Sequence, residues 1–174
     1  MITLLKAGIL TASDRSHRGE REDKSGLLLK VLLTHIPMEV VAYHVLSDEK
    51  EKIKRMLIHM TDIFHCDLIC TTGGTGLAPR DITPDATREV LDCEIPGIAE
   101  AVRAAGRQTR ATAMLSRGLA GVRKKTLIIN LPGSPKAVTD SFQVLQPILI
   151  HAIQLIRGEV KDCQSSSLLS HSHS

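Results

Sequence analysis

Short apolar runs alternate with stretches of helical periodicity along most of the chain, and this alternation constrains the fold more than any other feature. Runs typical of strands cover residues 4–12, 38–46, 67–72 and 126–133. Each of them is followed by a stretch typical of a helix, at residues 26–36, 53–64, 98–105 and 135–156. Strands that alternate with helices pair in parallel through right-handed crossovers. We therefore expect an α/β three-layer sandwich, with a mostly parallel central sheet and helices on both faces.

Local signals predict where several helices begin, end or bend. Ser25 is a natural N-cap for the first helix, and Pro37 is expected to stop it. Thr83 and Pro84 mark another helix start, because proline is pre-set for the first helical position. Pro147 lies inside the last helix and predicts a bend there.

The 174 residues suffice for one domain with a substantial core, which we expect to cover residues 1–160. The serine-rich stretch 161–174 has no periodic apolar face and is predicted to be a disordered tail. No apolar run reaches the roughly 18 to 20 residues that a membrane span needs. The apolar run at the N-terminus is better explained as a buried strand than as a signal peptide. We expect no membrane association.

Composition narrows the class of partner. The net charge is only +3, and the chain has no Trp, one Tyr and two Phe, so it lacks the aromatic platforms on which single-stranded nucleic acids stack. We expect small anionic ligands rather than nucleic acid. The four cysteines form no CxxC pair. This favours free structural thiols in a reducing cytoplasm over a metal site.

The stretch TTGGTGLAPRDITPDA, residues 71–86, directly follows a strand-type run. In an open parallel sheet, ligands bind beyond the carboxyl ends of the strands. The loops that leave the predicted strands at that edge are 13–26, 47–48, 73–83 and 131–134. We expect the functional site to lie among these loops.

Two of these loops share a pattern in which glycine, a hydroxyl residue and proline lead from a strand into a helix. The pattern occurs in TGGTG…TP and in NLPGSPK. Glycine lets backbone N–H groups approach a ligand closely, and a helix start offers unpaired donors to an anion. Neither the phosphate-loop motif with its lysine nor the GxGxxG dinucleotide motif fits the glycine loop. On spacing alone, the loop could also be a tight structural connection.

Three carboxylates, Asp14, Asp48 and Asp81, each follow a predicted strand and approach the same edge of the sheet. A single loop aspartate is usually a turn former, and Asp48 could simply cap the next helix. Three of them beside glycine loops suit a magnesium–phosphate site better, since Mg²⁺ takes one or two carboxylates together with phosphate oxygens. The arginines expected at the same edge are Arg15, Arg80 and Arg117.

The histidines lie in separate predicted elements, so no Ser–His–Asp or Cys–His set is expected. The chemistry should therefore consist of positioning and electrostatics, which phosphoryl and nucleotidyl transfers require.

The motifs resemble those of the molybdopterin adenylyltransferase (Mog/MoaB) family, which includes the G domains of gephyrin and its plant counterpart. The resemblance runs from about Leu5 to Gly158. It rests on ILTASDR, DKSG, TTGGTGLAPRDITPDAT, LSRGLAG and TLIINLPGSPKAV, which stand in the family's order. The glycine block with its following RDITPDAT is the most specific of these motifs.

The resemblance implies an enzyme of molybdenum cofactor synthesis. It would transfer AMP from Mg-ATP to the terminal phosphate of molybdopterin and release pyrophosphate. Mg²⁺ is the implied cofactor, with ATP as co-substrate, and a molybdenum-inserting enzyme would receive the product. The family forms trimers in which pterin and nucleotide share one long pocket. The alanine-rich stretch 97–115 could pack closely against a neighbouring subunit.

The resemblance also implies roles for single residues. Asp48 and Asp81 would be the catalytic and metal-associated carboxylates, so that magnesium and backbone N–H groups replace the missing lysine. The residues that would bind substrate are Ser13, Asp14, Arg15, Gly73, Gly74, Thr75, Gly76, Arg80, Ser116, Arg117, Gly133, Ser134 and Pro135.

Two other functions are compatible with the same sequence. A non-catalytic pterin-binding or scaffolding module could use the same fold, because fold does not determine function. The presence of Asp48 and Asp81 favours the enzyme. A Rossmann-like oxidoreductase is disfavoured by the broken glycine fingerprint.

Overall fold

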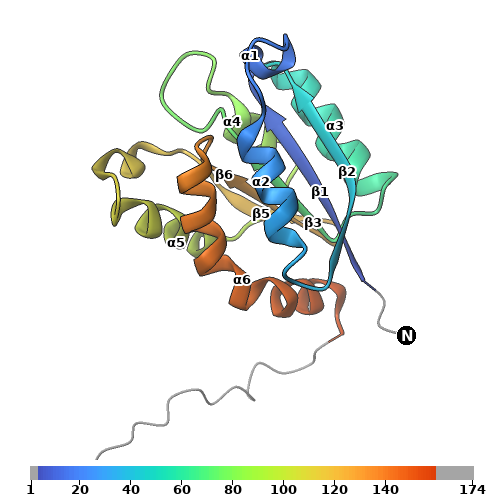
Figure 1. Cartoon of the computed structure of the whole chain (residues 1–174). Coiled ribbons are helices and arrows are strands. Elements are labelled where there is room, and N and C mark those ends of the chain that lie inside the picture. Colours follow the sequence, from blue (N-terminus) through green and yellow to red (C-terminus); the bar gives the residue numbers. More distant parts are fainter. Residues whose placement is uncertain (1–3, 160–174) are drawn as a thin grey trace, which may run out of the picture.

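A computed structural model describes residues 4–159. Their centre is a six-stranded sheet of order β2-β1-β3-β6-β5-β4 (Figure 1). The first four strands in this order are parallel, and the last two are antiparallel to their neighbours. The strands are β1 (Leu5–Ala12), β2 (Met38–Leu46), β3 (Leu68–Thr72), β4 (Cys93–Glu94), β5 (Ala120–Arg123) and β6 (Thr126–Leu131).

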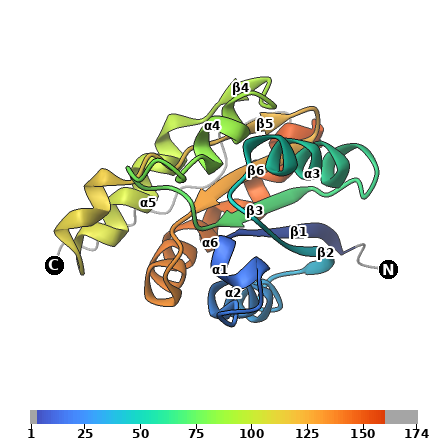
Figure 2. The same ribbon diagram turned by 90° about the horizontal axis from the view of Figure 1, so that it is seen from above.

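Helices cover both faces of the sheet, which confirms the predicted three-layer sandwich. Apolar residues of α2, α5 and α6 form one core with one face, and those of α3 and α4 form a second core with the other (Figure 2). The helical elements are α1 (Asp14–His17), α2 (Lys24–Leu33), α3 (Lys50–Asp62), α4 (Thr83–Arg88), α5 (Pro96–Arg107), the 3-10 helix η1 (Ala111–Leu115) and α6 (Pro135–Arg157).

The central strand β3 is buried along its whole length, as its continuous apolar run predicts. Leu68 and Cys70 belong to one core, whereas Ile69 between them belongs to the other. This alternation follows from the two-residue period of a strand. Burial raises the pKa of the Cys70 thiol to about 12, so this cysteine is an inert part of the core.

Several local predictions are confirmed and others are wrong. Helix α4 begins at Thr83 with Pro84 in its first turn, as predicted, and α6 contains Pro147 and changes direction part-way along its length (Figure 1). The N-cap of α2 is Asp23, not Ser25, because the Asp23 carboxylate accepts the N–H of Gly26 at 2.9 Å. The same helix ends at Leu33, before Pro37 can stop it.

The short strands β4 and β5 and the helix η1 have no counterpart in the sequence analysis. They are two, four and five residues long, which is too short for a periodic apolar pattern to identify them. No helix among residues 4–159 is long and apolar enough to span a membrane. The predicted tail, residues 161–174, lies outside the described part of the chain.

Candidate functional site

Backbone hydrogen bonds bring the predicted loops together at the carboxyl edge of the parallel strands. The N–H of Ser13 donates to the carbonyl of Leu46 at 2.9 Å, which joins the ends of β1 and β2. The N–H of Gly73 donates to the carbonyl of Leu131 at 3.3 Å, which joins the ends of β3 and β6. The expected position of the site is therefore a compact group of connected loops.

The glycine loop contains two residues with left-handed backbone conformation, Gly73 with φ 86° and Gly74 with φ 63°. A Cβ atom at Gly73 would collide with the carbonyl oxygen of Ala12, and one at Gly74 with the hydroxyl oxygen of Thr83. The second glycine turn packs against the first, because a Cβ on Gly133 would lie 3.2 Å from Cα of Gly73. Glycine is thus required here by close packing as well as by conformation.

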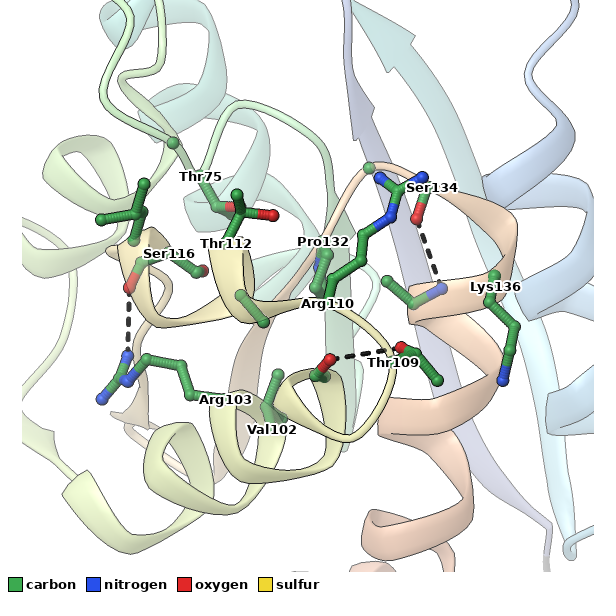
Figure 3. A pocket seen from close by; sticks show the side chains of 16 residues that line it. Thr75, Val102, Arg103, Thr109, Arg110, Thr112, Ser116, Pro132, Ser134 and Lys136 are labelled. Carbon is green, nitrogen blue, oxygen red and sulfur yellow. Dashed lines mark hydrogen bonds between the residues drawn. The ribbon is translucent and has the colours of Figure 1, made fainter.

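Two cavities lie beside this pair of turns. The first, of about 500 Å³, lies between the glycine loop, α5, η1 and the start of α6 (Figure 3). The second, of about 660 Å³, lies between the glycine loop, the loop after β1 and the same start of α6. Gly133 and Ser134 line both cavities and form the wall between them. Ser134 caps α6 by accepting the N–H of Ala137 at 3.3 Å.

The first cavity carries cationic residues that the sequence analysis missed: Arg103, Arg110 and Lys136. In Figure 3, Thr75 and Ser116 lie on the side opposite Ser134 and Lys136. The side chain of Arg103 is hydrogen-bonded to the backbone, since its Nη1 donates to the carbonyl of Gly118 at 2.9 Å. Two features of the sequence could have indicated these cations. One is the basic residues within the alanine-rich stretch, a stretch that we assigned to subunit packing, and the other is the lysine of NLPGSPK.

The second cavity is lined by two of the three predicted carboxylates, Asp48 and Asp81. Burial raises the pKa of Asp48, and the negative charges of Asp14 and Asp81 act in the same direction. Asp81 accepts the N–H of Ala78 through Oδ2 at 2.9 Å. The arrangement therefore places two mutually repelling carboxylates on one cavity, which is the charge pattern that a bound cation would relieve.

The third carboxylate, Asp14, lines neither of these two cavities. Nε and Nη2 of Arg80 donate to its two oxygens at 2.5 and 2.8 Å. The hydrogen bonds from Arg80 hold the pKa of Asp14 at about 2, below the ordinary value of 3.8. Ser13 caps α1 by accepting the N–H of Ser16 at 3.2 Å and lines the second cavity.

Arg117 also lies outside both cavities, and its guanidinium holds the glycine loop from behind. Nε donates to the carbonyl of Gly76 at 3.0 Å, and Nη2 donates to the carbonyl of Asp81. The same group pairs with the carboxylate of Asp85 at 3.0 Å. Arg15 is exposed and lines neither cavity. These two arginines therefore line neither cavity: Arg117 supports the glycine loop, and Arg15 lies outside the site.

A hydrogen-bonded group under the second cavity was also missed. Asp23, which lines this cavity, accepts hydrogen bonds from the hydroxyl of Tyr43 at 2.5 Å and from that of Thr11 at 2.6 Å. Oγ1 of Thr11 lies 3.2 Å from Oγ1 of Thr72, the residue before the glycine loop. Burial and the Asp23 carboxylate raise the pKa of Tyr43 far above its ordinary value. Only the DKSG motif could have indicated Asp23.

Among residues 4–159, no group of three or more His, Cys, Asp or Glu side chains could hold a metal ion. Asp48 and Asp81 are two carboxylates on one cavity, and each keeps one oxygen without a hydrogen-bond partner in the described part of the chain. Such a pair fits Mg²⁺, which completes its shell with phosphate oxygens and water.

Comparison with known proteins assigns the family. Residues 8–151 match the model of a family described as "Probable molybdopterin binding domain". A molybdopterin adenylyltransferase of Helicobacter pylori (strain ATCC 700392 / 26695) is 43% identical over 154 residues, which cover 87% of each chain. Gephyrin of Dictyostelium discoideum is 40% identical over 164 residues, which cover 88% of this chain and 23% of gephyrin.

Solved structures agree with the sequence comparison. The molybdopterin biosynthesis enzyme MoaB from Thermus thermophilus superposes with a TM-score of 0.84 and 50% sequence identity, covering 89% of this chain and 98% of the other. These findings confirm the resemblance drawn from the glycine loop and the NLPGSP turn. The chain belongs to the molybdopterin-binding domain family of molybdenum cofactor synthesis.

Proposed function

We propose that this protein is a molybdopterin adenylyltransferase, which transfers AMP from ATP to the terminal phosphate of molybdopterin and releases pyrophosphate. Relatives with this name are 43% identical in Helicobacter pylori and 37% identical in Escherichia coli, over 87% and 86% of this chain. The structural observation that carries the proposal is the pair of cavities that share Gly133 and Ser134.

Two substrates that exchange a nucleotidyl group must meet phosphate to phosphate. The shared wall is suited to this, because it stands at the start of the 23-residue helix α6, where unpaired N–H groups and the helix dipole favour anions. Lys136 and Arg110 add positive charge on the side of the first cavity. An oxygen of the molybdopterin phosphate would attack the α-phosphorus of ATP beside this wall, and pyrophosphate would leave with the electrons of the broken P–O bond.

We infer that Asp48 and Asp81 hold Mg²⁺ together with the triphosphate. When bound there, Mg²⁺ would neutralise charge that builds on the departing pyrophosphate. The position of both carboxylates on the second cavity supports this assignment, and burial, with a smaller contribution from the charge of Asp81, raises the pKa of Asp48. The backbone N–H groups of the glycine loop would supply further positive charge to the phosphates.

Asp14, Arg80 and Arg117 have positioning roles in this proposal. Asp14 and Arg80 hold the loops after β1 and β3 together, and Arg117 fixes the carbonyls of Gly76 and Asp81. The residues that we propose to contact substrate are Ser13, Gly73, Gly74, Thr75, Gly76, Ser116, Gly133, Ser134 and Pro135, all of which line one or both cavities.

We further propose a homotrimer that passes its product to a molybdenum-inserting enzyme in the cytoplasm. The alanine-rich stretch 97–115 ends in Met114 and Leu115, whose exposed side chains would be covered by a neighbouring subunit. The free thiols of Cys66 and Cys70 suit a reducing compartment.

One incubation tests the central proposal. The protein is mixed with ATP, Mg²⁺ and molybdopterin, and pyrophosphate release is measured. We expect turnover that depends on all three components. Molybdopterin binding without pyrophosphate release would instead identify a scaffolding module, and absence of both would refute the assignment.

A further inference from the structure

A third cavity, of about 580 Å³, lies at the opposite edge of the sheet, where the parallel strands begin. We call it the basal cavity. Lys6 at the start of β1, Asp67 before β3 and Thr126 at the start of β6 line it, together with the ends of α3 and α6. Even the five-residue strand β3 separates this edge from the glycine loop by on the order of 13 Å. The basal cavity is therefore distinct from the adenylyltransferase site.

The basal cavity carries more positive than negative charge. Four cationic side chains, Lys6, Lys124, Lys125 and Arg157, line it against two carboxylates, Asp62 and Asp67. Both carboxylates are already neutralised: Asp62 pairs with Lys124 at 3.0 Å, and Asp67 pairs with Arg157 at 3.2 Å. Among the described residues, the ammonium groups of Lys6 and Lys125 have no carboxylate partner. The surplus of two positive charges matches a phosphate group, which carries between one and two negative charges near pH 7.

Backbone conformation at the basal cavity is unusual for the residue types present. His65 with φ 51° and Lys124 with φ 53° are the two non-glycine residues of positive φ within 4–159, and both line this cavity. Lys124 and Lys125 form the two-residue connection between β5 and β6, and glycine would adopt the positive φ of the first position with less strain. Strained residues of this kind concentrate at binding sites. The left-handed residue Lys124 pairs with Asp62, and Lys125 beside it in the turn lines the same cavity.

The cavity wall also has unused hydrogen-bonding capacity. Thr61 is only 5% exposed, and its hydroxyl oxygen is buried without a hydrogen-bond partner in the described part of the chain. Its neighbour Asp62 and the adjoining Arg123 contribute two more of the four buried side-chain atoms in that state. Of these three residues, Thr61 and Asp62 line the cavity and Arg123 does not, and the Asp62 oxygen can only accept a hydrogen bond. The Thr61 hydroxyl is therefore the one group of the three that could donate to an anion there.

From the cavity, the left-handed backbone at His65 and Lys124, and the two lysines and the Thr61 hydroxyl that lack partners among the described residues, we propose that the basal cavity is a phosphate-binding site. Its ligand is inorganic phosphate or the phosphate group of a small organic monoester. Lys6 and Lys125 would hold the anion from the strand β1 and the β5–β6 turn, while Lys124 stays paired with Asp62. The site is independent of the reaction proposed for the opposite edge, so either assignment can fail without the other.

Backbone amide NMR of the full-length protein tests the proposal, because it separates the two edges of the sheet in one spectrum. Inorganic phosphate is titrated, with sodium chloride at equal ionic strength as the control for screening. We expect saturable shifts of the signals of His65, Lys124 and Lys125. A parallel titration with glycerol phosphate distinguishes the two sources: tighter binding identifies an organic monoester, and equal binding identifies phosphate alone.

Substitution then tests whether the lysines bind the anion. The double variant Lys6→Ala/Lys125→Ala changes two exposed side chains and should fold normally, yet bind phosphate at least tenfold more weakly. Lys30→Ala, an exposed lysine on α2, is the matched control and should bind as the wild type does. The proposal is overturned if chloride causes the same shifts, if phosphate shifts only the glycine-loop signals, or if the double variant binds unchanged.

Discussion

Asp14 and Asp48 exchange backbone-to-carboxylate hydrogen bonds: the N–H of Asp14 donates to Oδ2 of Asp48 at 2.9 Å, and the N–H of Asp48 donates to Oδ1 of Asp14 at 3.0 Å. This reciprocal pair ties the end of β1 to the end of β2. It leaves one oxygen of Asp48 for the second cavity, while Arg80 occupies the carboxylate of Asp14. Three carboxylates that look alike in the sequence therefore differ in the structure: Asp14 is paired with Arg80, whereas Asp48 and Asp81 line the second cavity.

The first prediction concerns Arg80→Ala and its dependence on pH. Hydrogen bonds from Arg80 lower the pKa of Asp14 to about 2, from an ordinary value of 3.8. A carboxyl group whose pKa is lowered by folding stabilises the folded state above its unfolded pKa, and this contribution disappears as the pH falls through the folded pKa. We expect Arg80→Ala to melt below the wild type at pH 5, with the difference vanishing towards pH 2. Thermal melts across this range measure it.

Arg15→Ala is the control for that experiment. Arg15 is exposed, and in the described part of the chain its side chain has no hydrogen-bond or ion-pair partner, so its removal should leave the melting curve unchanged at every pH. A difference between Arg80→Ala and the wild type that persists at pH 2 would mean that Arg80 acts through packing and not through Asp14.

Predictions from sequence were most successful where a pattern is local. The run that became β3 and the proline at the start of α4 were found, because period and proline geometry depend on neighbouring residues only. Ser25 is a residue for which the local pattern gave the wrong prediction. It looks like an N-cap in the sequence, but in the fold its hydroxyl donates to the carbonyl of Gly133 at 2.7 Å, 108 residues away. The N-cap of α2 is Asp23 instead.

The same limit applies to the candidate site. The carboxyl-edge rule placed Asp48 and Asp81 on one cavity, because it depends only on strand direction. The rule did not predict the first cavity. The wall of that cavity is formed by α5 and η1, after the chain has crossed the sheet. The rule also could not tell that Arg117 faces the loop carbonyls, since side-chain direction depends on tertiary packing.

A second prediction tests the hydrogen-bonded group beneath the second cavity. Tyr43→Phe removes one donor to the Asp23 carboxylate, a bond to a charged group that typically contributes about 1.5–3 kcal/mol. We expect a loss of this order in the free energy of unfolding, measured with urea. Thr11→Val removes another donor to the same oxygen. Because the two donors share an acceptor, the double variant should depart from additivity by more than about 0.5 kcal/mol, and strict additivity would contradict the network.

A third prediction concerns the tail. Deletion of residues 164–174 should leave folding and activity unchanged, because this segment has no periodic apolar face to bury. Thermal melting and pyrophosphate release of the truncated and complete proteins provide the comparison. A melting temperature lower by more than about 4 °C would correspond to a loss of roughly 1–2 kcal/mol and would show that the tail packs on the domain.

A fourth prediction concerns assembly. We expect a homotrimer, in which the exposed side chains of Met114 and Leu115 become covered. Sedimentation equilibrium at micromolar concentration measures the mass, and Met114→Glu tests the surface by placing a charge in it. A wild type that sediments as the 19.0 kDa monomer would refute the trimer, and an unaffected Met114→Glu trimer would place the interface elsewhere.

The last prediction tests the proposed mechanism through Asp81→Asn. Asparagine keeps the size of the side chain and can still accept the N–H of Ala78, so a turn-forming role would survive the change. If Asp81 instead holds Mg²⁺ against the triphosphate, the loss falls on the transition state, where charge builds on pyrophosphate. Losing one such contact costs about 2.7–4 kcal/mol, or roughly a hundred- to thousandfold in turnover. We expect that loss in pyrophosphate release, with molybdopterin affinity retained.

Asp92→Asn is the matched control for this change. Asp92 also accepts a backbone N–H, that of Lys124 at 2.6 Å, but it lines neither cavity of the site. Its variant should release pyrophosphate at the wild-type rate, so that any loss in Asp81→Asn can be attributed to position and not to the removal of a carboxylate. Turnover of Asp81→Asn within about tenfold of the wild type would exclude Asp81 from the metal site, because the remaining difference would be smaller than a lost electrostatic contact.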